Sequence, residues 1–585
     1  MKVLLVGINA KFIHSNLAIR YMQKVANSKE VNIDIVEYTI NQRVDEILSD
    51  IFKRKPDVLC FSCYLWNIEI VLKIMNAYKK ISKNTPIVLG GPEVSYEVDQ
   101  LMAQEEQIDF IIYGEGEETF KTLVTNLTME NPLFDTIEGL VYRKNNLIIS
   151  NAPRKPLLMD DLPFVYEEGL GELENKIIYY ESIRGCPFNC QYCLSSIEKG
   201  VRYRSFEKVK NELQFFLNHK VLQVKFVDRT FNCKKDHAMS IWSFLHLHDN
   251  GTTNFHFEIS ADLLDAETIA FLNTVRPGLF QFEIGVQSTH EATIEAIKRK
   301  TDFVQIVENV KRLKSSRNIH LHLDLIVGLP HENYSSFEES FNNVYCLKPE
   351  QLQIGFLKVL KGSGIYEKCE EYGLKYRDYA PYEVLLTKDM SYLEIQKLKM
   401  IEEMVEVYYN SGHYYYTVLY LEQLFNTPFK LFEALAEYWE ANHYHQISHS
   451  KISIATIIKD FGCIGVGVDT TFLENIIKLD WCLHEKVKKF PEWLNLTDAY
   501  SNEITSFYRN ESTISQYLPQ LEGYSSKQIS RMVHIEVFDY DMIRYQKSEG
   551  KEIDKRKTAL LFNYYERDKM RHNPRVFEVN IFPRK

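Results

Sequence analysis

The sequence lacks the features that would place it in several large classes of protein. No apolar run approaches the length of a membrane-spanning helix, and the opening stretch, residues 1–7, is too short for the apolar region of a secretory signal. Positive charge is in deficit: 69 Lys and Arg face 80 Asp and Glu, so no global field attracts a phosphate backbone. Only 10 cysteines occur in 585 residues, which disfavours a disulfide framework. We therefore expect a cytoplasmic protein that binds no membrane and for which nucleic acid is a disfavoured partner.

What is present is typical of a folded, multidomain chain. Hydrophobic residues make up 45% and charged residues 25% of the sequence, which is the globular average. At 585 residues the chain exceeds the size at which one hydrophobic core keeps growing. Two to four domains are expected on these grounds.

The first 130 residues repeat a strand-then-helix rhythm. Short apolar runs separated by amphipathic segments lie at residues 3–7, 33–38, 58–62, 87–90 and 110–113. Strands that alternate with helices predict a parallel sheet, here a flavodoxin-like or Rossmann-like doubly wound domain over residues 1–130. In such domains, ligands bind beyond the carboxyl ends of the strands.

The rest of the chain divides into a linker, a second α/β domain and a helical region. Residues 131–175 predict a linker with a hairpin around Asn145-Asn146. Residues 176–390 resume the rhythm and predict a partial barrel of six βα units. Its strands are expected at residues 179–183, 224–227, 255–259, 281–285, 320–327 and 351–357. In residues 391–585 the alternation gives way to helical patterns, so a mainly helical C-terminal domain is expected.

Three cysteines form the most informative motif. Cys186, Cys190 and Cys193 follow an apolar strand at spacings of four and three. Thiolates suit iron-sulfur clusters, and a four-iron cube held by three protein thiolates keeps one iron open for another ligand. Structural zinc is the disfavoured alternative, because it requires four ligands and no second cysteine pair lies nearby. The three cysteines are therefore predicted to be both the metal ligands and the catalytic centre.

This loop, with an aromatic residue before its last cysteine, resembles that of the radical S-adenosylmethionine (SAM) superfamily. Later segments resemble successive strand ends of its barrel, namely Phe226–Asn232, Glu258–Asp262, Glu283–Ser288 and Asp324–Pro330. The resemblance implies a 4Fe-4S cluster, SAM as cofactor and a 5′-deoxyadenosyl radical.

The same resemblance places Tyr192 beside the adenine and makes Asp228, Glu258 and Gln287 candidate contacts to SAM or substrate. Each of these residues is equally well interpreted as a satisfied strand-end group. Arg202 and Arg204 follow the loop, and a solvated position is favoured for them over an ion pair.

Three glycine-rich or small-residue segments in the first domain resemble a cobalamin-binding domain. They are Cys60–Asn67, Leu89–Glu93 and Tyr113–Glu117, in that order and upstream of the barrel. The resemblance implies that the nucleotide tail of cobalamin lies near Ser62, Gly90 and Gly91.

The Asp-x-His-x-x-Gly motif that supplies a cobalt ligand elsewhere is absent, and His14 is the alternative candidate. Cobalamin is therefore the expected cofactor of this domain. The alternative left open is that the domain has lost this cofactor. Cys60 and Cys63 are interpreted as buried, inert thiols.

The C-terminal region, with the segment Leu560–Arg567 near its end, resembles a domain of unknown function that follows cobalamin-linked radical barrels. The resemblance implies no substrate, and His413, His443, His445 and His449 only loosely suggest a metal site. The leading hypothesis is a radical SAM enzyme that methylates an unactivated carbon of an unknown small-molecule or peptide substrate, using cobalamin. It would need a reducing electron donor such as flavodoxin or ferredoxin.

Alternative functions are a cobalamin-dependent rearrangement, cyclisation or reduction, and a cobalamin-binding sensor with a vestigial barrel. Transfer-RNA methylthiolation is disfavoured, because it requires three N-terminal cysteines and only Cys60 and Cys63 lie there.

Overall fold

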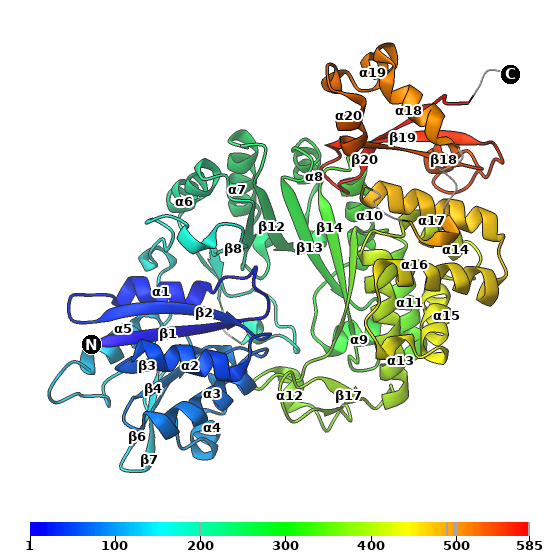
Figure 1. The fold of residues 1–585 in the computed structure, drawn as a ribbon. Helices are drawn as coiled ribbons and strands as arrows, with labels where there is room; N and C mark the ends of the chain where they lie inside the picture. Colours follow the sequence, from blue (N-terminus) through cyan, green and yellow to red (C-terminus); the bar gives the residue numbers. More distant parts are fainter. Residues whose placement is uncertain (198–199, 487–489, 495–499, 583–585) are drawn as a thin grey trace. The chain divides into compact units, whose positions relative to one another are not determined.

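The computed structural model describes residues 1–197, 200–486, 490–494 and 500–582. The chain forms two compact units (Figure 1). Unit 1 comprises Met1–Ser336 and Gly355–Tyr392, and unit 2 comprises Phe337–Ile354 and Leu393–Lys585. The chain therefore passes from one unit to the other more than once.

Unit 1 begins with a sheet whose first five strands are parallel. The strands are β1 (Lys2–Asn9), β2 (Asn32–Thr39), β3 (Val58–Ser62), β4 (Ile87–Gly90) and β5 (Phe110–Ile112), and they lie in the order β2-β1-β3-β4-β5. Each strand is a short apolar run, which is the pattern expected in a parallel sheet that is buried on both faces. The doubly wound domain predicted from the sequence is confirmed.

Helices cover both faces of this sheet (Figure 1). Helices α1 (Leu17–Ala26) and α5 (Glu117–Asn126) pack against one face. Helices α2 (Val44–Arg54), α3 (Ile68–Ile81) and α4 (Val98–Gln104) pack against the other. Helix α1 begins where Asn16 accepts a hydrogen bond from the Ile19 backbone N–H at 3.3 Å, which satisfies a donor at the helix end.

The hairpin around Asn145-Asn146 forms and extends the first sheet. Strands β6 (Leu140–Lys144) and β7 (Leu147–Ser150) pair antiparallel, and β6 pairs antiparallel with β5. Asn145 and Asn146 have φ values of 49° and 64°, the left-handed conformation that a two-residue hairpin turn requires. The sheet of the first domain thus continues beyond residue 130, to Ser150.

The second sheet has six strands in sequence order. They are β8 (Ile178–Tyr180), β11 (Gln223–Phe226), β12 (Asn254–Ile259), β13 (Phe280–Gln287), β14 (His320–Val327) and β15 (Gln351–Phe356), which crosses the boundary between the units. The pairings from β8 to β14 are parallel. Between these strands lie α6 (Phe206–Asn218), α7 (Lys235–Leu247), α8 (Ala266–Leu272), α9 (Glu291–Ala296), α10 (Phe303–Lys314) and α11 (Tyr334–Tyr345). The partial six-stranded barrel is confirmed.

A segment after the barrel returns to the first domain. It contains α12 (Gly364–Glu367), β16 (Lys375–Tyr376) and β17 (Val384–Leu386). The hydroxyls of Tyr366 and Tyr382 donate to the carboxylates of Glu97 and Glu93 in the first domain. The Ile365 backbone N–H donates to Gln191 O in the cysteine loop at 2.9 Å. This segment therefore braces both the first domain and the loop.

Unit 2 is mainly helical, as expected, but it also holds a sheet that the sequence did not predict. Its helices include α13 (Tyr392–Met404), α14 (Tyr415–Glu422), α15 (Pro428–Ala441), α16 (Lys451–Asp460) and α17 (Thr470–His484). Strands β18 (Val533–Phe538), β19 (Thr558–Arg567) and β20 (Pro574–Val579) form an antiparallel sheet. Helices α18 (Ser501–Arg509), α19 (Glu511–Tyr517) and α20 (Ser526–Met532) pack near it, and α21 (Met542–Lys547) lies between β18 and β19.

A further observation concerns the length and hydropathy of the helices in the described ranges. None of them combines the length and the apolar character needed to cross a lipid bilayer.

Candidate active site

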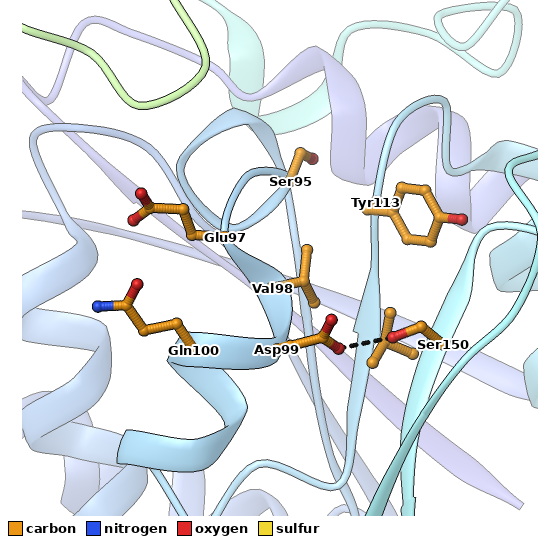
Figure 2. Close-up of a pocket in the computed structure, with 8 residues that line it drawn as sticks. Ser95, Glu97, Val98, Asp99, Gln100, Tyr113 and Ser150 are labelled. Carbon is orange, nitrogen blue, oxygen red and sulfur yellow. Dashed lines mark hydrogen bonds between the residues drawn. The ribbon is translucent and has the colours of Figure 1, made fainter. Parts of the chain in front are cut away.

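Two of the cavities among the described residues of unit 1 have a volume of about 460 Å³ each. The first lies beside α4, and Figure 2 shows its lining, where the Ser150 hydroxyl donates to Asp99 at 2.6 Å. No residue predicted for the site lines it. The second, called here the central cavity, is lined by residues from strand ends of both domains. They are Asn9, Ala10, His14, Ser15, Asn16, Leu17, Ala18, Tyr21, Tyr64, Trp66, Glu117, Tyr179, Glu181, Arg184, Lys225, Val227, Arg229 and Glu258.

The cysteine loop is held by backbone contacts from its neighbours. Cys190 is buried, whereas Cys186 and Cys193 are partly exposed. The Gln191 N–H donates to Ile297 O at 2.9 Å, and the Ser196 hydroxyl donates to the Cys190 and Cys193 carbonyls at 2.8 and 2.6 Å. The fold therefore fixes the path of the loop around its thiols.

Asp228, at the end of β11, anchors the start of this loop. Its carboxylate accepts hydrogen bonds from the Ser182 and Ile183 backbone N–H groups at 2.9 and 3.0 Å and from the Ser182 hydroxyl. Burial raises the pKa of Asp228 to about 7, although these hydrogen bonds oppose the shift. The side chain is fully buried and engaged by the fold, so we propose a positioning role for it in place of direct SAM contact.

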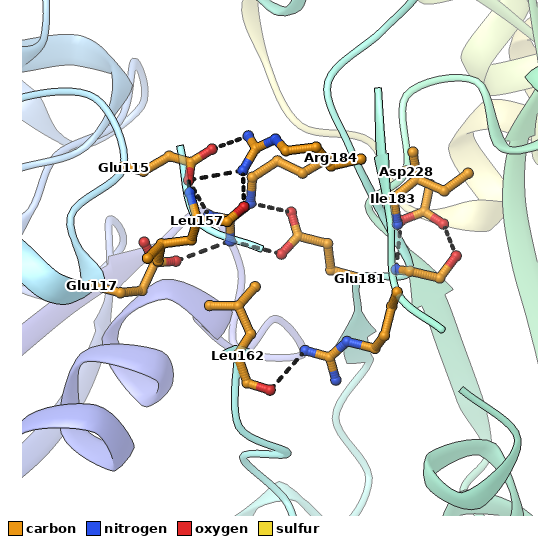
Figure 3. Close-up of polar contacts among 11 residues, drawn as sticks. Glu115, Glu117, Leu157, Leu162, Glu181, Ile183, Arg184 and Asp228 are labelled. Atoms are coloured by element: carbon orange, nitrogen blue, oxygen red, sulfur yellow. Dashed lines mark hydrogen bonds and ion pairs between the residues drawn. The ribbon is translucent and has the colours of Figure 1, made fainter. Parts of the chain in front are cut away.

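Arg184 joins the cysteine loop to the first domain (Figure 3). Its guanidinium pairs with Glu117 and Glu181 at 2.9 Å each and with Glu115 at 3.3 Å. Arg202, on the far side of the loop, also pairs with Glu115. Glu115 and Glu117 both belong to the glycine-rich Tyr113–Glu117 segment. The acidic side chains of this segment therefore bind the arginines that flank the cysteine loop.

The favoured solvated position for the two arginines after the loop is wrong. Arg202 pairs with Glu115, and Arg204 is only 1% exposed and pairs with Glu212. Arg204 also donates to Leu162 O at 3.3 Å. The ion pairs were not visible in the sequence because their partners lie on other elements.

Arg299 is a site residue that the sequence reasoning missed. It donates to the Tyr192 hydroxyl at 2.9 Å, to Cys190 Sγ at 3.8 Å and to the Gly285 carbonyl. Its only signal in the sequence is the short basic run at residues 298–300. Burial raises the pKa of the Cys190 thiol, and the Arg299 charge opposes that shift. A cation therefore lies beside a predicted cluster ligand.

Glu258 and Gln287 lie at strand ends inside the barrel. Burial raises the pKa of Glu258, and Arg229, 3.8 Å away, opposes the shift. Gln287 has a φ of 73°, and its amide lies over Gly285, where an added Cβ would come within 2.2 Å of Gln287 Nε2. Glu258 lines the central cavity, whereas Gln287 does not.

A cluster of charged and polar side chains lies in the barrel interior beside Glu258. Glu283 pairs with Lys225 at 3.0 Å and with His256 at 3.1 Å. Burial alone would raise the pKa of Glu283, but the His256 hydrogen bond and the Lys225 charge hold it below its usual value. Burial lowers the pKa of His322 to about 4 and raises that of Asp324. The barrel interior is thus polar and suited to binding charged or hydrogen-bonding groups.

The predicted residues of the first domain lie at the ends of β3 and β4. The Ser62 hydroxyl accepts a hydrogen bond from Asn16 Nδ2 at 3.1 Å, and Gly90 O accepts from the Cys63 N–H at 2.7 Å. Gly91 has a φ of 117°, and a Cβ there would lie 2.4 Å from Cys63 O. These residues hold the two loops against each other, and their contact with a nucleotide tail stays a proposal.

Some of the remaining histidine and cysteine candidates from the sequence are engaged in hydrogen bonds or buried in the fold. His14 Nδ1 shares a hydrogen bond with the Tyr179 hydroxyl at 2.7 Å, and burial lowers the pKa of His14. Cys60 and Cys63 are both buried, as expected, and burial raises the pKa of both thiols, which disfavours the reactive thiolate. In unit 2, His413 contacts His484 through their Nε2 atoms.

Comparison with protein families assigns three domains. A family model described as a B12 binding domain matches residues 3–124, and one described as the Radical SAM superfamily matches residues 180–344. The chain therefore contains a B12-binding domain followed by a radical SAM domain. A protein of unknown function model (DUF4080) matches residues 370–562.

Over the aligned residues, curated relatives are about a quarter identical to this chain. The cobalamin-dependent radical SAM methyltransferase TokK of Streptomyces tokunonensis is 26% identical over 350 residues, 55% of this chain and 50% of TokK. An anaerobic magnesium-protoporphyrin IX monomethyl ester cyclase of Cereibacter sphaeroides is 23% identical over 334 residues, 54% of this chain and 53% of the cyclase. The chain spans about half the length of these relatives.

Solved structures share the fold of the B12-binding and radical SAM domains. OxsB with aqua-cobalamin bound superposes with a TM-score of 0.57 at 16% identity, covering 82% of this chain and 79% of OxsB. TsrM of Kitasatospora setae, with cobalamin and a [4Fe-4S] cluster bound, gives a TM-score of 0.53 at 15% identity, covering 65% of this chain and 78% of TsrM. These similarities establish the architecture.

The residues present fit the cofactors that these domains imply, a 4Fe-4S cluster with SAM and cobalamin. Cys186, Cys190 and Cys193 supply soft thiol ligands on one loop. In a four-iron cube each thiolate meets its own iron atom, so the sulfurs need not converge on one point. The described residues contain no group of three His, Cys, Asp or Glu side chains arranged around a single metal ion. For cobalamin, the central cavity offers an aromatic pair, Tyr64 stacked on Trp66 with ring centroids 4.5 Å apart, and a buried carboxylate oxygen on Glu117.

Proposed function

We propose that the protein is a cobalamin-dependent radical SAM methyltransferase that adds a methyl group to an unactivated carbon of a small-molecule or peptide substrate. The observation that carries this proposal is the central cavity, because strand ends of both the B12-binding and the radical SAM domains line it. The curated relative TokK, which is named as such a methyltransferase, supports the reaction class.

The chain's own residues would hold and separate the reactants. Cys186, Cys190 and Cys193 would hold the cluster, and Tyr192 would lie beside the adenine of SAM. When bound, the cluster and SAM supply a 5′-deoxyadenosyl radical, and cobalamin supplies a transferable methyl group. The polar groups of the barrel interior, Glu258 among them, would orient the substrate so that its reacting carbon faces both cofactors. We keep Gln287 as a candidate contact to SAM.

A cyclisation, rearrangement or reduction without methyl transfer is the second candidate. The observation that favours it is the similarity to a relative named as an anaerobic cyclase, at nearly the same coverage as TokK. Both reactions would use the same two cofactors, so only the product distinguishes them.

The proposed chemistry also requires a reducing partner and a reducing compartment. The cluster held by Cys186, Cys190 and Cys193 would need a one-electron reductant, for which a flavodoxin or a ferredoxin is the proposed donor. All ten cysteines are free in the structure, as expected of a protein that works in the cytoplasm.

The first experiment is anaerobic purification with hydroxocobalamin, followed by iron, sulfide and cobalt quantification on one sample. We expect about four irons and about one cobalt per chain for the proposed cofactors. A Cys186→Ala, Cys190→Ala and Cys193→Ala triple variant should lose the iron and keep the cobalt. Iron retained by the triple variant would refute the cluster assignment, and a wild-type sample without cobalt would refute the cobalamin assignment.

The second experiment identifies the reaction. The reduced protein should cleave SAM to 5′-deoxyadenosine, and candidate substrates should gain about one methylene unit in mass. SAM cleavage with a product of unchanged mass would favour rearrangement over methylation. Absence of SAM cleavage by a fully loaded and reduced sample would overturn the proposal of an enzyme.

A further inference from the structure

Glu117 lines the central cavity and has a buried carboxylate oxygen without a hydrogen-bond partner among the described residues. It is the first residue of α5, it lines the cavity, and it is only 4% exposed. Its Oε1 atom pairs with Arg184 Nη2 at 2.9 Å, whereas its Oε2 atom has no hydrogen-bond partner among the described residues. Figure 3 draws the ion pair between Glu117 and Arg184. A buried carboxylate oxygen without a partner is costly, so a ligand that donates to it would be favoured.

The charges around Glu117 hold its carboxylate in place. The Arg184 guanidinium pairs with it, and the N-terminus of α5 favours a negative charge in its first turn. Its neighbour in the network, Glu181, differs because both of its oxygens accept from Arg184, at 3.1 and 2.9 Å. Glu115 also pairs with Arg184 but does not line the cavity. Among these three glutamates, Glu117 alone combines the cavity position with a free oxygen.

A neutral N–H donor is the chemistry that suits this oxygen. The rim of the corrin ring of cobalamin carries primary amides, whose N–H groups donate without bringing a charge into the cavity. We infer that Glu117 Oε2 accepts a hydrogen bond from one of these peripheral amides when cobalamin fills the cavity. Because Glu117 is bonded to Arg184 at the start of the cysteine loop, the same carboxylate would fix the corrin relative to the cluster. This inference rests on the proposed binding of cobalamin.

The test uses cobalamin monocarboxylic acids, in each of which one side-chain amide has been hydrolysed to a carboxylate. An added carboxylate facing Glu117 would both lose the N–H donor and place a second acid group against the Glu117 carboxylate. We therefore expect one isomer to bind the wild-type protein about tenfold more weakly than cyanocobalamin or worse. Equilibrium dialysis with cobalt quantification measures both dissociation constants on the full chain.

Two variants separate this contact from the ion pairs. Glu117→Gln removes the charge and can donate to the added carboxylate, so the discrimination between the acid and the amide should fall below about threefold. Glu115→Gln weakens the same Arg184 network outside the cavity and should keep the discrimination. Equal binding of every isomer to the wild type, or unchanged discrimination in Glu117→Gln, would overturn the inference while the proposed function stands. Failure of cyanocobalamin itself to bind would overturn both.

Discussion

Two adjacent glycines, Gly90 and Gly91, differ in what they do at the end of β4. Gly91 needs the left-handed conformation and close approach to Cys63 O, whereas a Cβ at Gly90 would meet its nearest neighbour at an ordinary 3.7 Å. We expect Gly91→Ala to destabilise the protein by about 2 kcal/mol or more, because strain and overlap combine. Gly90→Ala should cost less than about 1 kcal/mol. Urea unfolding monitored by circular dichroism measures both, and equal effects would contradict the assigned role of Gly91.

Arg299 is the residue expected to tune the cluster. Its cationic Nη1 lies 3.8 Å from Cys190 Sγ, and a nearby positive charge favours the more negative, reduced cluster. We expect Arg299→Gln to make the reduction midpoint potential more negative, as measured by an anaerobic redox titration followed by electron paramagnetic resonance. The exposed neighbour Lys300 provides the control, because Lys300→Gln should leave the potential unchanged. A potential that does not move in Arg299→Gln would show that the contact is structural only.

Residue contacts of this kind mark the limit of what the sequence could predict. The three cysteines were predictable because their spacing lies within one short loop. Arg299 meets Cys190 across 109 positions of the chain, and Arg184 meets Glu117 across 67, so no local pattern indicated either pair. The sequence indicated which segments carry candidate site residues, and the fold determined which of their atoms meet.

At the scale of elements, strands buried on both faces were readily predicted and the C-terminal sheet was not. The parallel strands of unit 1 are continuous apolar runs between amphipathic helices, a pattern with one interpretation. Strand β19 (Thr558–Arg567) ends in a run of Asn, Tyr and Glu whose burial alternates, and it follows short helices. A mixed run of that length fits a helix as well as a strand, and only its pairing with β18 and β20 decides between them.

The contact between His484 of α17 and His413 of the loop before α14 is expected to make the stability of unit 2 depend on pH. Burial lowers the pKa of His484 from 6.5 to about 4, and burial also lowers that of His413. Between pH 6.5 and about 4 the unfolded chain binds the proton more readily than the folded one, so stability falls as pH falls through this window.

We expect acidification from pH 7 to pH 5 to cost unit 2 about 1 kcal/mol from His484, a value reduced because the side chain is only half-buried. His484→Gln should flatten this dependence, and His443→Gln provides a control from the same unit. Thermal unfolding at the two pH values measures the effect. An equally steep pH dependence in His484→Gln would show that other groups cause it.

At the scale of the whole molecule, most of helix α11 belongs to unit 2, although the helix lies within the barrel sequence. The rings of Phe341 and Tyr345 are fully buried, and both pack on Phe432, with centroids 5.9 and 5.6 Å apart. A chain that ends at residue 392 would leave these rings exposed, although it retains the whole radical SAM match at residues 180–344. We expect this truncated chain to aggregate, as shown by size-exclusion chromatography against the full chain. Phe341→Ser in the truncated chain should recover part of the soluble yield, and a truncated chain as soluble as the full one would contradict this view.

The repeated passage of the chain between its units also limits how recombination can exchange these units during evolution. Because unit 2 takes Phe337–Ile354 from within the barrel sequence, a single recombination junction cannot exchange that unit between two barrels. A hybrid joined after residue 392 would pair a foreign α15 with the resident α11, and Phe341 would face Phe429 and Phe432 of another lineage. Descent of the C-terminal unit should therefore follow that of the barrel, with substitutions in α11 matched by substitutions in α15.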